Sequence, residues 1–210
     1  MRDTRRVGWV LECASLGKRF GTRWVFRGLS VRVMQGTLLT VRGSNGSGKS
    51  TLLRLIAGLM APTEGQVRLG YATQTLTPCT DWLGWCATDG ALYRELTAYE
   101  HLHWWATVRG GMPTQPLLME WLARYELAER AHDRVRTFST GMRQRLRLAL
   151  ATWGRPPVLL LDEPDAGMDP RGIDLLERTL HEQRTFGLAL FATNRPEHAR
   201  WGDLVLEMGA

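Results

Sequence analysis

The chain has 210 residues, with a hydrophobic content of 44% and a charged content of 23%. These values exclude wholesale disorder and leave room for one α/β domain, with or without an inserted lobe, rather than two independent domains. The formal net charge of +6 comes with arginines spread along the chain and no block of like charges, so we expect no nucleic-acid partner.

The N-terminal third predicts strands and a helix around a glycine-rich loop. VGWVLEC (residues 7–13) and WVFRGLSVRV (24–33) are rich in β-forming residues and predict short antiparallel strands, with a turn-rich stretch over 16–23 between them. TLLTVRG (37–43) predicts a buried strand, and KSTLLRLIAG (49–58) predicts a helix that a glycine closes.

Three helices are predicted in the middle of the chain, over LHWWATVRG (102–110), LLMEWLARYEL (117–127) and GMRQRLRLALATW (141–153). Thr97 and Glu100 form a capping box that starts the first of them. In the third, leucines and alanines are expected to face a core while the arginines lie outside.

The last quarter predicts alternating strands and helices. PVLLLDEP (157–164) is a short apolar run that ends in acids, a pattern typical of a central parallel strand. A helix over 172–184 and strands over 188–193 and 203–208 follow. The predicted fold class is α/β, with a helical insertion between the glycine-rich loop and the acidic strand.

Cysteine spacing and hydropathy bear on the compartment. Cys13, Cys79 and Cys86 are odd in number and lack C-x-x-C spacing, which argues against a disulfide framework or a zinc site and fits a reducing cytoplasm. The start has no apolar core of signal-peptide length, and no run approaches the roughly 18 apolar residues of a membrane span. We therefore expect a cytoplasmic chain that does not cross a membrane by itself but is free to dock on a membrane protein.

The glycine-rich loop is a phosphate-binding motif. Residues 43–50 read GSNGSGKS, which satisfies G-x-x-x-x-G-K-S, and a strand and a helix flank the motif as it requires. The glycines let backbone N–H groups turn inward around phosphate oxygens, next to the positive end of the helix. The loop residues expected to contact the nucleotide are Gly43, Ser44, Asn45, Gly46, Ser47, Gly48, Lys49, Ser50 and Thr51.

The side chains at the end of this motif have separate expected roles. Lys49 is expected to reach the β and γ phosphates, Ser50 to bind Mg²⁺ and Thr51 to touch the α phosphate. Asp162 and Glu163 end the strand VLLLDEP, where the first carboxylate can hold Mg²⁺ and the second can orient or deprotonate an attacking water. Together these residues predict a site for a nucleoside triphosphate with Mg²⁺.

A second phosphate-binding element is predicted about twenty residues before Asp162. Ser139 and Gly141 precede a helix, so a hydroxyl and an open N–H lie at another positive helix end. An ordinary helix cap by Ser139 or Thr140 is the alternative interpretation.

These motifs, followed by AGMDP (166–170), resemble the ATP-binding subunit of an ABC transporter, from KRFG to DLVLEM. The resemblance implies one domain over 1–210, with a P-loop NTPase core and an N-terminal antiparallel β subdomain over 1–92 and 154–210, and an inserted helical subdomain over 93–153. It also implies that two such domains, identical or paralogous, meet head to tail with ATP between them, and that a transmembrane permease holds them at the inner face of the membrane.

The resemblance carries roles onto further residues of this chain. Phe20 in KRFG matches the aromatic that stacks on adenine, and Glu163 matches the catalytic carboxylate. Ser139, Gly141 and Gln144 match the signature that faces the other domain, although STGMRQ departs from the commoner SGGQ wording. Asp169 matches the aspartate at the dimer seam.

Two family positions carry other residues. A glutamine that contacts Mg²⁺ falls on Thr88 or Asp89, and a histidine that contacts the γ phosphate falls on Asn194. Asparagine keeps an amide donor of shorter reach and carries no positive charge, so we expect slow hydrolysis. His198, four residues on, is interpreted as a surface histidine of a helix.

Several functions stay open. GSNGSGKSTLLRLIAGL and ELTAYEHLHWW resemble most the haem-exporter subunit of the cytochrome c maturation system, while STGMRQRL is as common in drug, lipid and polysaccharide exporters. An ATP-gated clamp or regulatory subunit with little turnover is the alternative to a transport ATPase. A chromosome-repair or translation ATPase is disfavoured because no long coiled-coil insertion or second set of motifs is present. We expect the permease to dock near Tyr93, Trp104 and Trp105.

Overall fold

Two long strands begin the fold of the computed structural model, which describes residues 8–209 apart from 73, 77–81, 88, 89 and 91. β1 (Trp9–Phe20) and β2 (Arg23–Met34) pair antiparallel, as predicted. The predicted turn over 16–23 is wrong for most of its length. Register irregularities between Cys13 and Arg19 let β1 bend and continue to Phe20. β4 (Glu64–Tyr71) and β5 (Gln74–Leu76) complete this sheet in the order β2-β1-β4-β5.

A second sheet is parallel throughout and has the strand order β6-β7-β8-β3-β9. Its strands are β3 (Leu38–Arg42), β6 (Leu83–Ala87), β7 (Val158–Asp162), β8 (Leu188–Thr193) and β9 (Leu204–Glu207). Every residue of β7 and β8 is buried, as expected for strands whose two faces are both covered. The strand that ends in Asp162 is, as predicted, a buried parallel strand with a neighbour on each side, although β8 is the one at the centre.

The helices begin close to where their capping residues predict. Thr97 and Glu100 form both hydrogen bonds of the capping box ahead of α2. Two short 3-10 turns, Ala128–Arg130 and Val135–Thr137, lead into α4. The helices are α1 (Lys49–Ile56), α2 (Ala98–Val108), α3 (Gln115–Arg124), α4 (Thr140–Thr152), α5 (Pro170–Phe186) and α6 (Pro196–Ala199). No helix in the described part of the chain is long and apolar enough to cross a bilayer.

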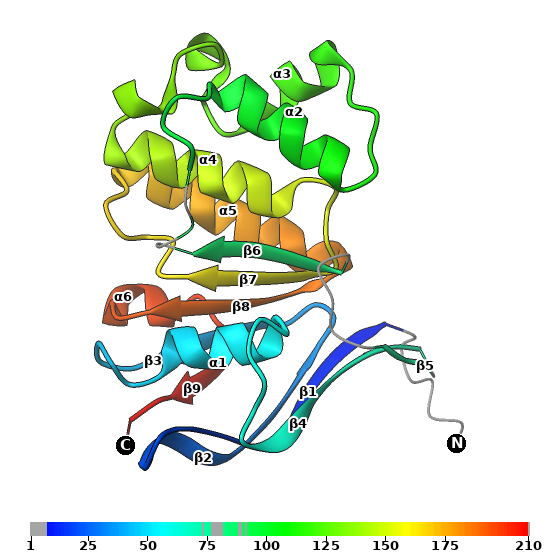
Figure 1. Cartoon of the computed structure of the whole chain (residues 1–210), viewed down its shortest axis with the longest axis vertical. Coiled ribbons are helices and arrows are strands. Elements are labelled where there is room, and N and C mark those ends of the chain that lie inside the picture. Colours follow the sequence, from blue (N-terminus) through cyan, green and yellow to red (C-terminus); the bar gives the residue numbers. More distant parts are fainter. Residues whose placement is uncertain (1–7, 73, 77–81, 88–89, 91, 210) are drawn as a thin grey trace.

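Two hydrophobic cores form, one on each face of the parallel sheet. Leu159, Leu161 and Phe191 belong to the core that α2 to α5 cover, whereas Leu160 and Leu190 belong to the core under α1 and the antiparallel sheet. Figure 1 shows α2, α3, α4 and α5 above β6, α1 at the height of β3, and the β1, β2 and β4 strands at the bottom. The predicted α/β fold class is confirmed.

Candidate functional site

The register of the parallel sheet brings three loops to one edge. Arg42 pairs with Thr193, and Asp162 pairs with Ala192. The residues that follow these pairs, Gly43, Asn194 and Glu163, therefore leave the sheet side by side, at the edge to which the arrowheads point in Figure 1. Strands far apart in the sequence thus build one site because parallel strands share a carboxyl edge.

The phosphate loop needs glycine at Gly48. This residue has φ 103° and caps α1, and a Cβ added to it would lie 2.6 Å from Cγ1 of Val25 on β2. Any other residue would therefore meet both backbone strain and a clash. Gly46 also has a positive φ, 82°, with open space around it, and Ser44, Asn45 and Gly46 are exposed. The loop is held open toward solvent at the positive end of α1.

The Lys49 ammonium lies at the centre of this loop. Only 4% of the residue is exposed, and Nζ donates to the carbonyl oxygens of Gly43 at 2.8 Å and Ser44 at 3.2 Å. Nζ also lies 3.3 Å from Oε1 of Glu163. These contacts hold the Lys49 ammonium at the centre of the loop, where phosphate oxygens would bind.

The two acids at the end of β7 differ in burial and backbone. Asp162 is 3% exposed, whereas the Glu163 side chain is 28% exposed and its backbone adopts a left-handed φ of 47°. The Glu163 N–H donates to the Ala192 carbonyl at 2.9 Å, which fixes this turn against β8. The strained backbone aims the Glu163 carboxylate at the Lys49 ammonium.

Oxygen groups at this edge fit a Mg²⁺ ion. The Asp162 carboxylate ends a buried strand, and Ser50 is half-buried in the first turn of α1, one residue after Lys49. Carboxylate and hydroxyl oxygens are the ligands that Mg²⁺ prefers, together with waters and substrate phosphates. Thr88 and Asp89 lie outside the described residues, so their expected contact with Mg²⁺ stays a prediction.

Asn194 touches the phosphate loop directly. Its Nδ2 donates to Oδ1 of Asn45 at 3.3 Å, across 149 positions of sequence. The interpretation of His198 as a surface residue is wrong, since His198 is 8% exposed and its Nδ1 lies 2.6 Å from Oδ2 of the buried Asp165. The α6 helix is only four residues long and packs on β3 and β8, so its inner face is buried. His198 does not take the place of a histidine at position 194.

The exposed end of α4 carries two of the three predicted signature residues. Ser139 caps α4 by accepting the Met142 N–H at 3.1 Å, and its expected contact with a phosphate stays a prediction. Gly141 lies beside the segment around Gly167, whose carbonyl oxygen is 3.6 Å from the position of a Cβ at Gly141. Gln144 is 2% exposed, and its Oε1 accepts from Arg147. The structure therefore does not bring Gln144 to the surface that Ser139 and Gly141 share.

Arg145 departs from the expectation that the α4 arginines lie outside. It is 8% exposed and binds both carboxylate oxygens of Asp169 at 2.8 Å, as well as Glu126 at 2.7 Å. Asp169 also caps α5 by accepting the Gly172 N–H, and this hydrogen bond, followed by Arg145, lowers the pKa of its carboxyl. Sequence reasoning missed Arg145 because its spacing alone does not distinguish a buried ion pair from a solvated charge.

Phe20 ends β1, on the strand pair that packs against the phosphate loop. Its ring is 51% exposed, with the Lys18 ammonium 5.1 Å from the ring centroid. Phe20 pairs with Arg23 of β2, and the nearby Val25 and Phe26 of that strand contact the Cβ position of Gly48. An open aromatic face thus lies on the strand pair that supports the loop.

The sequence profile of a family described as ABC transporter matches residues 26–166. The chain belongs to the ABC transporter family. Over 209 residues, 96% of this chain and 98% of the relative, it is 35% identical to the cytochrome c biogenesis ATP-binding export protein CcmA 2 of Cupriavidus metallidurans. It is 36% identical over 78% of its length to the ABC transporter ATP-binding protein YdbJ of Bacillus subtilis, which is described as uncharacterized. The chain spans about half of the length of this second relative, 54%.

Solved structures agree with this assignment. An ATP-binding subunit of an ABC transporter superposes with a TM-score of 0.80 at 27% identity, over 96% of this chain and 88% of that one. A dimeric, post-hydrolysis ATP-binding cassette bound to ADP and Pi superposes with a TM-score of 0.81 at 22% identity, over 94% of each chain, and this likeness concerns the fold alone. The chain therefore has the ATP-binding fold of the ABC transporter family.

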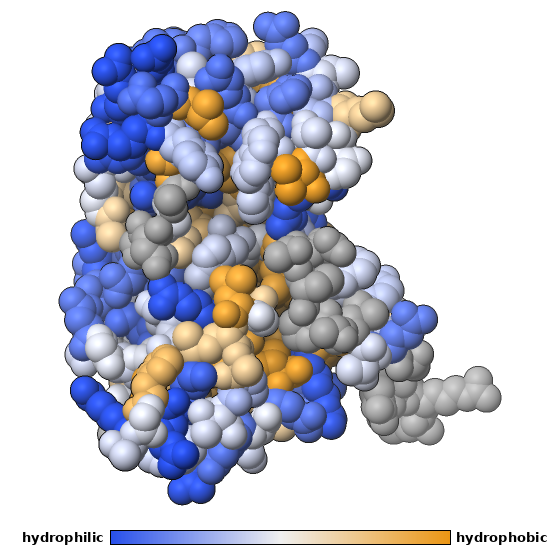
Figure 2. Space-filling view, viewed as in Figure 1, coloured by the Kyte–Doolittle hydropathy of each residue, from blue (hydrophilic) through white to orange (hydrophobic). Residues whose placement is uncertain are grey.

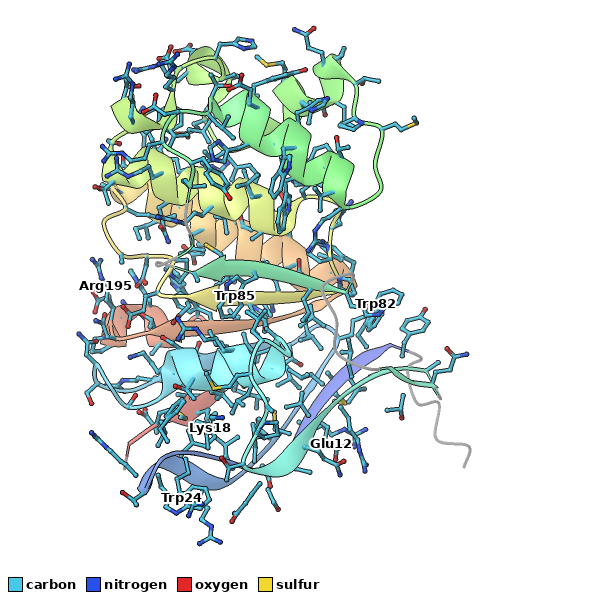
Figure 3. All side chains as sticks on the ribbon, viewed as in Figure 1. Glu12, Lys18, Trp24, Trp82, Trp85 and Arg195 are labelled. Atoms are coloured by element: carbon cyan, nitrogen blue, oxygen red, sulfur yellow. The ribbon has the colours of Figure 1, made fainter. Side chains whose placement is uncertain are left out.

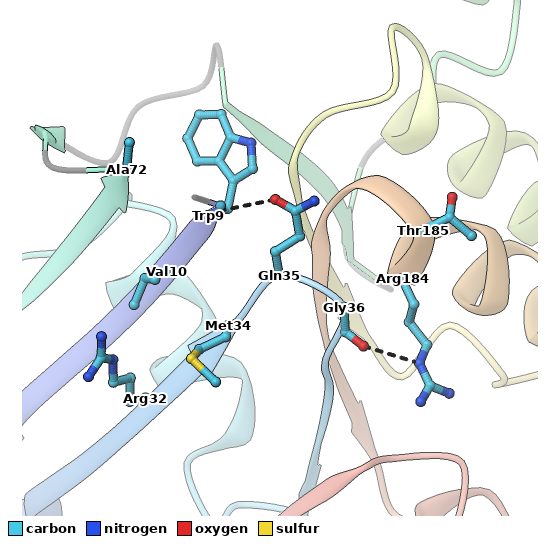
Figure 4. Close-up of a pocket in the computed structure, with 10 residues that line it drawn as sticks. Trp9, Val10, Arg32, Met34, Gln35, Gly36, Ala72, Arg184 and Thr185 are labelled. Atoms are coloured by element: carbon cyan, nitrogen blue, oxygen red, sulfur yellow. Dashed lines mark hydrogen bonds between the residues drawn. The ribbon is translucent and has the colours of Figure 1, made fainter. Parts of the chain in front are cut away.

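Among the hollows that the described residues of this ABC protein line, two contain tryptophan beside a strand end and no residue of the phosphate loop. One, of about 840 Å³, is lined by the start of β1, the end of β2 and Arg184 and Thr185 of α5 (Figure 4). The other, of about 170 Å³, lies between β6, α2 and α4 and is lined mostly by apolar side chains, including Trp85, Trp104 and Trp105. Figure 2 shows apolar side chains over the middle of this face of the molecule, and Figure 3 shows Trp85, which belongs to β6.

Proposed function

We propose that the chain binds Mg-ATP at the phosphate loop and hydrolyses it slowly to drive transport through a membrane partner. The observation that carries this proposal is the 3.3 Å contact between Lys49 and Glu163, which joins the phosphate loop to the acidic end of β7. A loop of inward amides, a buried ammonium and an adjacent carboxylate are what phosphoryl transfer to water requires.

The residues divide this work. Lys49 and the amides of residues 43–51 hold the phosphates, while Ser50 and Asp162 hold Mg²⁺, which neutralises phosphate charge when bound. Glu163 orients the attacking water and accepts its proton. Asn194 donates an amide hydrogen bond toward the γ phosphate from a shorter, uncharged side chain than histidine. All residues proposed to bind Mg-ATP are therefore present, whereas the hydrolysis step has a weaker donor at position 194 and is slow.

The exposed end of α4 in one domain is proposed to complete the nucleotide site of a second domain. Ser139 and Gly141 lie at the positive end of a 13-residue helix, on a surface that the chain's own phosphate loop does not cover. A second copy or a paralogue would place this end on the bound nucleotide, in a head-to-tail pair.

The experiment that tests this function compares turnover with dimerisation. Glu163→Gln keeps the shape of the side chain but removes the base, so it is expected to abolish turnover and to leave an ATP-dependent dimer that size-exclusion chromatography detects. Lys49→Ala is the matched control, and it should lose both binding and dimerisation. Dimers of wild type that persist with ATP without any turnover would favour the alternative, an ATP-gated clamp.

The membrane partner is proposed to dock on the apolar hollow between β6, α2 and α4. Tyr93 is 64% exposed and Trp104 is 52% exposed, and both line this hollow together with Trp105. Exposed aromatic anchors around a pocket are typical of protein interfaces. Docking there would hold the chain on the cytoplasmic face of the membrane.

Export of haem for cytochrome c maturation is the proposed transport reaction. The support is the 35% identity to the export protein of Cupriavidus metallidurans over nearly the full length of both chains. A linearmycin resistance ATP-binding protein of Bacillus subtilis is also similar, at 29% identity over 88% of this chain, so a drug exporter is the alternative. Co-purification with a haem-export permease tests the first, and co-purification with a drug-export permease alone would contradict it.

A further inference from the structure

A buried polar cluster lies beneath the loop that carries Asn194. Asp165, at 1% exposure, accepts hydrogen bonds at Oδ2 from Oγ1 of Thr193 at 2.9 Å and from Nδ1 of His198 at 2.6 Å. Nε of Arg195 lies 3.9 Å from the same oxygen. Nothing in the sequence motifs assigns a role to Asp165, Thr193 or His198 together.

The cluster ties two loops of the site together. Asp165 follows Glu163 by two residues, in the loop after β7, whereas Thr193 ends β8 and His198 belongs to α6, on either side of the loop that carries Asn194. The His198 ring stacks on Trp201 at 4.4 Å, and Trp201 stacks on the buried Phe191 at 5.6 Å, so aromatic rings seal one side. A buried carboxylate needs several hydrogen-bond donors, and Asp165 has them only while the two segments keep their relative positions.

Thr193 links this cluster to the backbone on both sides of Asn194. Its hydroxyl donates to Asp165, and the same oxygen accepts the Arg195 N–H at 3.0 Å. Thr193 is fully buried, whereas the Asn194 side chain is exposed and reaches Asn45 of the phosphate loop. The cluster therefore holds the backbone from which Asn194 projects (Figure 3 shows Arg195 at this edge).

We propose that Asp165, Thr193 and His198 are positioning residues that fix Asn194 and Glu163 relative to each other above the phosphate loop. This inference rests on the proposed function of Asn194 as a donor to the γ phosphate. An asparagine amide has a short reach, so a displacement of its backbone by a fraction of an ångström moves the donor out of range. A chain with asparagine at this position thus depends on a rigid backbone there.

The test uses a matched pair of substitutions. Thr193→Val keeps the volume of the side chain but loses the hydroxyl, whereas Thr193→Ser keeps the hydroxyl and both hydrogen bonds. In the protein without nucleotide, we expect hydrogen exchange of the amides at residues 194 and 195 to be about tenfold faster in Thr193→Val and close to wild type in Thr193→Ser. For Mg-ATP we expect kcat to fall about tenfold in Thr193→Val with an unchanged Kd.

A double substitution separates positioning from a structural role. In an Asn194→Ala background, Thr193→Val is expected to cause no further fall in kcat, because it acts through Asn194. Equal rate losses in both backgrounds, or equal exchange rates in Thr193→Val and Thr193→Ser, would overturn the proposal. If wild type neither binds nor hydrolyses Mg-ATP, the proposed function fails, while the exchange rates still decide whether the cluster holds the loop.

Discussion

At the scale of single residues, Phe20 offers the open aromatic face that an adenine ring would use. Stacking of a base on an aromatic side chain is worth about 1 to 3 kcal/mol, so Phe20→Ala is expected to raise the Kd of Mg-ATP at least about fivefold. Phe20→Tyr keeps the ring and should bind like wild type. Isothermal titration calorimetry measures both, and Met34→Ala, an exposed residue at the far end of β2, is the control. An unchanged Kd in Phe20→Ala would exclude the stacking role.

At the same scale, the sequence placed Lys49 and Glu163 at one site but did not predict the burial of Gln144 and His198. Lys49 and Glu163 come together as expected, because the register of parallel strands fixes where their loops emerge. Gln144 and His198 differ from expectation, since one is buried and the other is bound to a buried acid. Spacing along a helix does not reveal which face the rest of the molecule covers.

At the scale of elements, α2 depends on a neutral histidine. His101 donates from Nδ1 to the Thr97 carbonyl at 2.9 Å and accepts the Tyr93 N–H at Nε2, at 3.0 Å. The two bonds form together only in the neutral imidazole, because Nε2 accepts only when it carries no proton, and burial is the main cause that lowers the pKa of His101. Protonation would set two donors, Nε2–H and the Tyr93 N–H, against each other.

This arrangement predicts a pH-dependent stability. As the pH falls from about 7.5 through the ordinary histidine value near 6.5, the unfolded chain takes up the proton before the folded chain, so the free energy of unfolding decreases. His101→Asn removes this contribution, and its stability should fall less over the same range. Urea denaturation at pH 7.5 and 5.5 measures it, with the exposed His103→Asn as control. Equal pH slopes for wild type and His101→Asn would contradict the assignment.

Elements with local signals were predicted well. The capping box at Thr97 fixed the start of α2 because its bonds lie within four residues. The length of β1 was not predictable in the same way. Most of the turn-forming residues over 16–23 lie in β1, which accommodates them through register irregularities. Pairing with β2 and β4 stabilises these irregularities, and the local sequence does not reveal it.

At the scale of the whole molecule, the apolar hollow adjoins the nucleotide edge, since Ala87 lines the hollow and pairs with Asp162. Double substitution of Tyr93 and Trp104 by alanine is expected to abolish co-purification with the membrane partner, because it removes the two exposed anchors of the hollow. Binding of Mg-ATP should stay unchanged, since neither residue lies in the phosphate loop. Co-purification that survives the double substitution would place the docking surface elsewhere.

The central claim is that the substitution of histidine by asparagine at position 194 leaves the affinity for Mg-ATP intact but lowers the rate of hydrolysis. The most direct measurement is steady-state ATP hydrolysis by wild type, Asn194→His and Asn194→Ala, together with the Kd of Mg-ATP for each. Since one transition-state donor is commonly worth about a hundredfold in rate, wild type should be slow, Asn194→His faster and Asn194→Ala slower still, all with similar Kd. A fast wild-type rate that Asn194→Ala leaves unchanged would contradict the claim.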